Sequence, residues 1–281
     1  MTEAGIITLI LVFANVLCSY PGLKNHFYHE HYAFKIEKIL VGKEYRRFVT
    51  SGFFHVSWIQ LIVNMVSLCF FSGGVELHLG VAKYLLIYFA SLVGGNLFSL
   101  LIHRKHGDYS SIGATGAVNG IIFASIAVVP GYEIGLFGID FPIPGWFYGL
   151  LFVLFSIYAV NSKRENIGHE SHLAGGLFGL LIAVLIQPAI FAHNYAAIFA
   201  LALPSLFFIY MIITKPRFLF IDNNFFSHHK DNYTIDHNYN SEKVDQQKEI
   251  DLILEKIHQK GIGSLTKKEK EKLDYYSRII Q

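Results

Sequence analysis

Seven long apolar stretches run through this 281-residue chain, and they limit its possible folds more than any other feature. Each is roughly 17–25 residues long, the length that an α-helix needs to cross the hydrocarbon core of a bilayer. Hydrophobic residues make up 53% of the chain and charged residues only 16%. We therefore predict an integral membrane protein of the all-α class, a polytopic helix bundle. The stretches lie near residues 5–21, 58–75, 81–102, 114–130, 145–161, 171–190 and 196–214.

The last two stretches are the hardest to separate. Only Pro188 and the polar pair His193-Asn194 interrupt the apolar run, so a single bent helix is the alternative to two spans. The whole run is too long for one crossing of a bilayer, which favours two.

The composition changes after the seventh stretch, and this change predicts three parts. Residues 1–215 form the transmembrane domain. Residues 216–244 are polar and rich in Asn and His, which is typical of a linker. Residues 245–281 combine apolar residues at helical spacing with a capping box that begins at Thr266, so they are predicted to form a short soluble module of two helices. The partner of this helix pair is left open.

Polar residues inside three of the spans are the second informative feature. Gln60 and Asn64 are four residues apart and therefore share one side of a helix, Thr115 lies near the start of another span, and His172 begins a third. Polar side chains are costly in hydrocarbon, so they normally face the interior of a bundle and find partners there. A hydroxyl, an imidazole and two carboxamides that meet in a bundle would supply a nucleophile, a base and oxyanion donors.

Each of these residues also has a structural explanation. Carboxamides form hydrogen bonds between membrane helices, worth on the order of 0.6–2 kcal/mol each. Gly113, Gly116 and Gly175 are small residues of the kind that lets membrane helices pack closely. Glu76 lies at the opposite end of the span that carries Asn64, so we expect it to have a structural role rather than to act as a catalytic acid.

No metal site is predicted. The segment His169-Glu170-Ser171-His172 does not have the spacing of a zinc protease, and no other group of histidines has a clear ligand geometry. No organic cofactor is predicted either. The formal net charge of +2 gives no reason to propose nucleic acid as a partner. A channel or transporter is disfavoured because the spans carry no series of acidic residues that could relay ions.

Taken in order, these residues resemble the pattern of the rhomboid family of intramembrane serine proteases. The resemblance covers about residues 45–190, and the segment after residue 245 resembles a short module appended to many rhomboid-like proteins of Bacteroidetes. It implies a six-helix catalytic core, to which the seventh span is added, and a Ser–His dyad that cleaves transmembrane protein substrates near the membrane surface. The matching residues are His55, Gln60, Asn64, Glu76, Gly80, Gly113, Thr115, Gly116, His172, Leu173 and Gly175.

The resemblance places Thr115 at the position of the nucleophilic serine and His172 at that of the base. Asn64 and the backbone N–H of Thr115 would donate to the oxyanion, and Gln60 stands where the family usually has a second histidine. Thr keeps a hydroxyl and Gln keeps an N–H donor, which favours a working serine-type peptidase, slowed by the added methyl group. The alternative is a catalytically inactive pseudoprotease that binds membrane proteins.

The expected location is a membrane, and the bacterial inner membrane in particular. Basic residues gather in the connections that lead to Thr115 and His172. The positive-inside rule favours a cytoplasmic position for that face, whereas the resemblance usually places the catalytic opening on the outside. Both orientations stay open.

Overall fold

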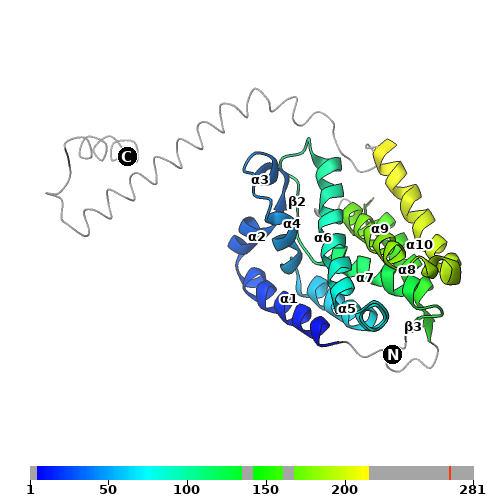
Figure 1. Cartoon of the computed structure of the whole chain (residues 1–281). Helices are drawn as coiled ribbons and strands as arrows, with labels where there is room; N and C mark the ends of the chain where they lie inside the picture. The colour runs from blue at the N-terminus through cyan, green and yellow to red at the C-terminus, as the bar shows by residue number, and fades with distance from the viewer. Residues whose placement is uncertain (1–4, 135–141, 161–167, 215–265, 267–281) are drawn as a thin grey trace. The chain divides into compact units, whose positions relative to one another are not determined.

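Seven long helices form a bundle in the computed structural model, which describes residues 5–134, 142–160, 168–214 and Thr266 (Figure 1). Four of the helices are long and apolar enough to cross a membrane, and α7, α8 and α9 are shorter apolar helices. The predicted polytopic helical membrane bundle is therefore confirmed. The long helices are α1 (Ile6–Lys24), α5 (Trp58–Leu79), α6 (Val81–His103), α7 (Thr115–Val128), α8 (Gly145–Val160), α9 (His169–Ile186) and α10 (Ala189–Thr214).

The connection between α1 and α5 is folded into short elements. In chain order these are α2 (His26–Tyr32), β1 (Phe34–Lys35), α3 (Ile36–Leu40), α4 (Arg47–Thr50) and the 3-10 helix η1 (Ser51–Phe53). Strand β1 pairs antiparallel with β2 (Ser110–Ser111), so this connection is joined to the one that precedes α7. A second antiparallel pair, β3 (Glu133–Ile134) and β4 (Ile143–Pro144), lies between α7 and α8.

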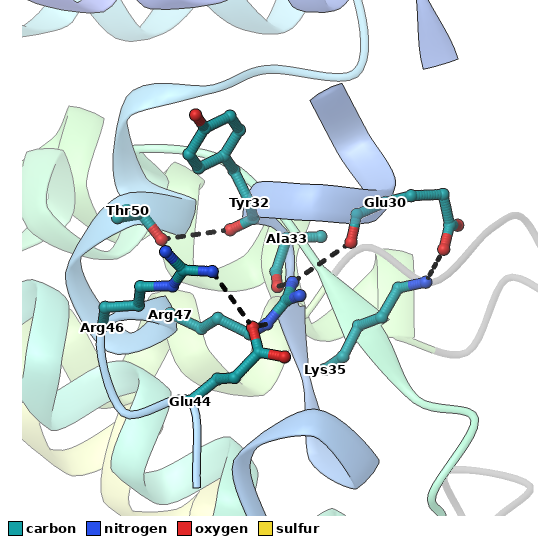
Figure 2. A network of polar contacts seen from close by, with 8 residues as sticks. All are labelled: Glu30, Tyr32, Ala33, Lys35, Glu44, Arg46, Arg47 and Thr50. Carbon is teal, nitrogen blue, oxygen red and sulfur yellow. Dashed lines mark hydrogen bonds and ion pairs between the residues drawn. The ribbon is translucent and has the colours of Figure 1, made fainter. Parts of the chain in front are cut away.

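Arg47 holds the first connection in shape, as Figure 2 shows. Its buried guanidinium donates through Nη1 to the backbone carbonyls of Ala33 at 2.7 Å and Glu30 at 3.2 Å, and through Nε to Glu44 at 2.9 Å. Burial favours the protonated form of Glu44, but Arg47 and Arg46 outweigh it and lower the pKa of this carboxyl. These bonds between separate segments make the connection a folded element of the bundle.

Helix α7 lies in the centre of the bundle. Every residue from Thr115 to Val128 is buried, and the helix contacts α5, α6, α8, α9 and α10. Apart from Thr115, Asn119 and Ser125 its residues are apolar or glycine, which is the pattern of a helix that is surrounded by other helices. A residue at the start of α7 is therefore placed inside the protein rather than against lipid.

Glycines bring α7 and α9 into backbone contact. A methyl group at Gly175 would overlap the carbonyl oxygen of Gly116, and one at Gly179 would overlap that of Gly120. Small residues four apart are the usual means of close approach between membrane helices. The contact places the first turn of α7 beside the first turn of α9.

Two helices, rather than one bent helix, form the end of the bundle. The break between α9 and α10 lies at Gln187 and Pro188, while Asn194 marks a kink inside α10, where its φ and ψ are −136° and 29°. At this kink Asn194 Nδ2 donates to the carbonyl of Ile126 at 2.6 Å, near the last turn of α7. The proposed linker and the C-terminal module, residues 216–281, lie outside the described residues except for Thr266, which is exposed.

The contact between α7 and α9 predicts that one alanine substitution lowers the stability of the protein and that another leaves it nearly unchanged. Gly175→Ala forces a methyl group into the backbone of α7, so we expect the free energy of unfolding to fall by about 1–3 kcal/mol. Gly116→Ala is the matched control, because a methyl group there would lie 3.5 Å from its nearest neighbour, the carbonyl oxygen of Ser171. Unfolding in detergent, followed by circular dichroism, measures both. Equal losses in the two variants would contradict this account of the contact.

Candidate active site

A sharp turn delivers the chain to Thr115, the first residue of α7. Gly113 has a φ of 140°, which residues with a side chain rarely adopt, and its N–H donates to the carbonyl of Ser51 at 2.9 Å. A methyl group at Gly113 would lie 2.5 Å from Gln60 Nε2 and 3.5 Å from Thr115 Oγ1. The backbone conformation therefore favours glycine here, and a larger residue would have to displace the Gln60 carboxamide beside the Thr115 hydroxyl.

The Thr115 hydroxyl contacts a carboxamide of α5. Asn64 Nδ2 donates to Thr115 Oγ1 at 3.1 Å and lies 3.0 Å from His55 Nε2. Thr115 is 9% exposed, Asn64 4% and His55 0%, so the contact is removed from bulk solvent. The structure thus joins two of the predicted site residues and adds His55, which the sequence analysis included in the family pattern without giving it a role.

Gln60 lies one turn before Asn64 on α5, and its carboxamide contacts the backbone. Its Oε1 accepts from the N–H of Val56 at 3.1 Å, and its Nε2 donates to the carbonyl of Ile112 at 3.2 Å. Gln60 therefore connects the start of α5 to the turn before Thr115. The second hydrogen on Nε2 is the one that could serve an oxyanion without breaking the bond to Ile112.

His172 lies in the first turn of α9, and its backbone is bonded to α7. Asn119, one turn after Thr115, donates through Nδ2 to the carbonyl of His172 at 3.2 Å. His172 lines a small hollow together with Gly113 and Gly116, which lie within two residues of Thr115 in the sequence. The hydroxyl and the imidazole expected from the sequence thus belong to adjacent turns of two helices in contact.

A buried carboxylate that the sequence analysis did not assign fixes the start of α9. Glu170 Oε1 accepts from Ser99 Oγ at 3.1 Å, His103 Nε2 at 3.1 Å and Tyr109 OH at 2.5 Å. The rings of His103 and Tyr109 stack with their centroids 3.8 Å apart. Since Ser99 and His103 belong to α6, this cluster links α6, the connection after it and the turn that carries His172. Glu170 lies 61 to 71 residues after the other three members, so no local sequence pattern reveals the cluster.

Glu76 lies at the end of α5 that is remote from Asn64. Thr8 Oγ1 is within hydrogen-bonding distance of both Glu76 Oε2, at 3.3 Å, and Tyr84 OH, at 3.1 Å. The residue therefore links α5 to α1 and takes no part in the contacts around Thr115 described above.

The fold and these contacts define a class: a polytopic helical membrane protein with a buried hydroxyl beside a carboxamide and a histidine. The profile of the Rhomboid domain family matches residues 42–189, more than half of the chain. The chain therefore belongs to the rhomboid family. Residues 233–279 match a family of unknown function, DUF6576, which overlaps the expected C-terminal module.

Several curated proteins are similar to this chain. RHOMBOID-like protein 12, mitochondrial, of Arabidopsis thaliana is 23% identical over 185 residues, which cover 60% of this chain and 54% of the relative. Rhomboid protein 1, mitochondrial, of Saccharomyces cerevisiae is 29% identical over 147 residues, 50% of this chain and 42% of the relative. The rhomboid-named protein YdcA of Bacillus subtilis is 27% identical over 144 residues, 50% of this chain and 67% of the relative. The chain thus spans about half the length of the first two relatives.

The cluster around Glu170 predicts graded effects on stability. Glu170→Ala leaves three buried donors without their acceptor, so the free energy of unfolding should fall by about 3–5 kcal/mol. Glu170→Gln keeps one carbonyl oxygen and should lose less. Glu133→Ala changes an exposed carboxylate and serves as the control, with an expected change within about 0.5 kcal/mol. Denaturant unfolding in detergent measures all three, and a loss in Glu170→Ala no larger than that in the control would show that the cluster does not anchor α9.

His55 predicts a pH dependence of stability. This residue lies in the connection before α5, where burial lowers the pKa of its imidazole to about 4. The unfolded chain takes up a proton on His55 near pH 6.5, whereas the folded chain stays neutral until about pH 4. The stability that this group contributes is therefore full above pH 6.5 and falls by about 3 kcal/mol between pH 6.5 and pH 4. Unfolding free energies of the wild type and of His55→Gln should converge over this range, and parallel curves would contradict the assignment.

Proposed function

We propose that this chain is a rhomboid intramembrane endopeptidase of the serine type in which Thr115 takes the place of the serine. The contact of Asn64 Nδ2 with Thr115 Oγ1 at 3.1 Å is the observation that supports this most. It places a hydroxyl and an N–H donor together at the buried start of a helix, as nucleophilic attack and oxyanion stabilisation require. The substrates are transmembrane proteins, presented from the bilayer that surrounds the bundle.

The proposed reaction uses groups of this chain alone. His172 takes the proton of the Thr115 hydroxyl as Oγ1 attacks the carbonyl carbon of the scissile peptide. Asn64 Nδ2, Gln60 Nε2 and the backbone N–H of Thr115 hold the oxyanion. The first N–H groups of α7 have no partner within the helix, and its dipole favours negative charge there. His172 then gives its proton to the leaving amine, and water hydrolyses the ester.

A second candidate function is that of a pseudoprotease, which binds membrane proteins without cleaving them. The contacts of Gln60 favour it, because this carboxamide already connects Val56 to Ile112. In this function the side chains around Thr115 hold α5, α7 and α9 together. The location in a bacterial inner membrane and the division into a domain of residues 1–215, a linker and a C-terminal module belong equally to both proposals.

Cleavage of a tagged model transmembrane substrate in cells tests the proposed function. Thr115→Ala and His172→Ala should each reduce cleavage by at least about 10³-fold, because either change removes a member of the dyad. Thr115→Ser should keep or raise the rate, since it removes only the methyl group that restricts χ1. Thr214→Ala, at an exposed threonine at the end of α10, is the matched control and should cleave like the wild type.

The remaining outcomes separate the two candidate functions. Cleavage by Thr115→Ser but not by the wild type would show a complete site that the methyl group of Thr115 disables. No cleavage by any correctly inserted version would support the pseudoprotease. A hydroxyl-reactive inhibitor should label cleavage-competent protein at Thr115, and labelling elsewhere would contradict the nucleophile assignment.

A further inference from the structure

We propose that Ser19 and His55 are positioning residues that turn the Asn64 carboxamide so that it directs N–H groups, and not its carbonyl oxygen, toward Thr115. Ser19 lies on α1 and His55 in the connection before α5, and both are fully buried. The inference deepens the proposed function, because the direction of this amide decides whether Asn64 is able to stabilise an oxyanion.

The series of hydrogen bonds begins at the backbone carbonyl of Phe53. Ser19 Oγ lies 3.0 Å from the carbonyl oxygen of Phe53, which accepts only, so Ser19 is the donor. Its single hydrogen is thereby used. Ser19 Oγ must then be the acceptor in its 2.8 Å contact with His55 Nδ1, and Nδ1 carries the imidazole proton.

The second ring nitrogen of His55 is consequently an acceptor. A neutral imidazole has one protonated nitrogen and one lone pair, and His55 is neutral at pH 7 because burial lowers its pKa to about 4. The backbone N–H of Ala114, which only donates, lies 3.4 Å from Nε2. This contact is independent of Ser19 and assigns the same role to Nε2.

The acceptor on His55 decides which atom of Asn64 faces it. A carbonyl oxygen would place two lone pairs against each other, so the atom 3.0 Å from His55 Nε2 is Nδ2. The second hydrogen of Nδ2 is directed to Thr115 Oγ1 at 3.1 Å. The Thr115 hydroxyl thus accepts from Asn64, and its own hydrogen is left to be given to a base. With the proton on His55 Nε2 instead, the carboxamide would reverse and present its oxygen.

Nitrogen NMR of the histidine rings measures this arrangement directly. The full chain is labelled with ¹⁵N-histidine and placed in nanodiscs, and the His55 signals are identified as those lost in His55→Gln. We expect a neutral ring with its proton on Nδ1 at pH 7. Ser19→Ala should shift the population toward the form protonated on Nε2. Ser205→Ala, at a buried serine of α10 that bonds within its own helix, should leave the spectrum unchanged. A proton on Nε2 in the wild type, or an unchanged ring in Ser19→Ala, would overturn the inference.

Kinetics separate this inference from the proposed function. Loss of one oxyanion donor lowers kcat by about 10²–10³-fold. Ser19→Ala weakens the orientation without removing Asn64, so kcat should fall about tenfold while KM stays constant. An unchanged kcat, or a change in KM alone, would contradict the positioning role. A wild type that cleaves nothing but shows the proton on Nδ1, sensitive to Ser19, would refute the proposed function and uphold the orientation of Asn64.

Discussion

The backbone contact between α7 and α9 is the constraint on which the site depends. Lipid is as apolar as the core, so membrane helices associate through close packing and hydrogen bonds rather than through the hydrophobic effect. Glycine at 175 and 179 of α9 lets the two backbones touch at Gly116 and Gly120, and Gly95 of α6 approaches the same turn of α9 at Ser171. A larger residue at Gly175 would push apart the turns that carry Thr115 and His172.

Polar contacts complete what the glycine contact begins, because they bond the two turns to each other and to α5 and α6. Asn119 holds the backbone of His172, Gln60 holds the turn before Thr115, and Glu170 holds the start of α9 against α6. The other end of α7 is held by Asn194 from α10. These contacts hold the groups around Thr115 in place. In the proposed reaction, dipoles that are fixed in this way would stabilise a developing charge without reorganising.

The sequence predicted the helices well because hydropathy is a property of whole segments. It also predicted that Gln60 and Asn64 share a face, since a spacing of four residues determines that. It did not reveal the link from Ser19 through His55 to Asn64, nor the partners of Glu170, because these side chains come from segments that only the packed bundle brings together. The break at Pro188 and the kink at Asn194 show the same limit. Both interruptions of the apolar run were visible in the sequence, but only the structure shows that the helix breaks at the first and that Asn194 contacts α7 at the second.

The hydrogen bond from Asn64 to Thr115 differs in strength between the resting state and the proposed reaction. At rest Nδ2 donates to a neutral hydroxyl, and such a bond contributes about 1 kcal/mol. When the oxyanion forms, the same N–H finds a charged acceptor, and charge-assisted hydrogen bonds are roughly twice as strong. Only an interaction that strengthens in the transition state accelerates a reaction. A carboxamide turned the other way would oppose the negative charge. A His55 ring with its proton on Nδ1 is therefore as necessary to this difference as the hydroxyl of Thr115.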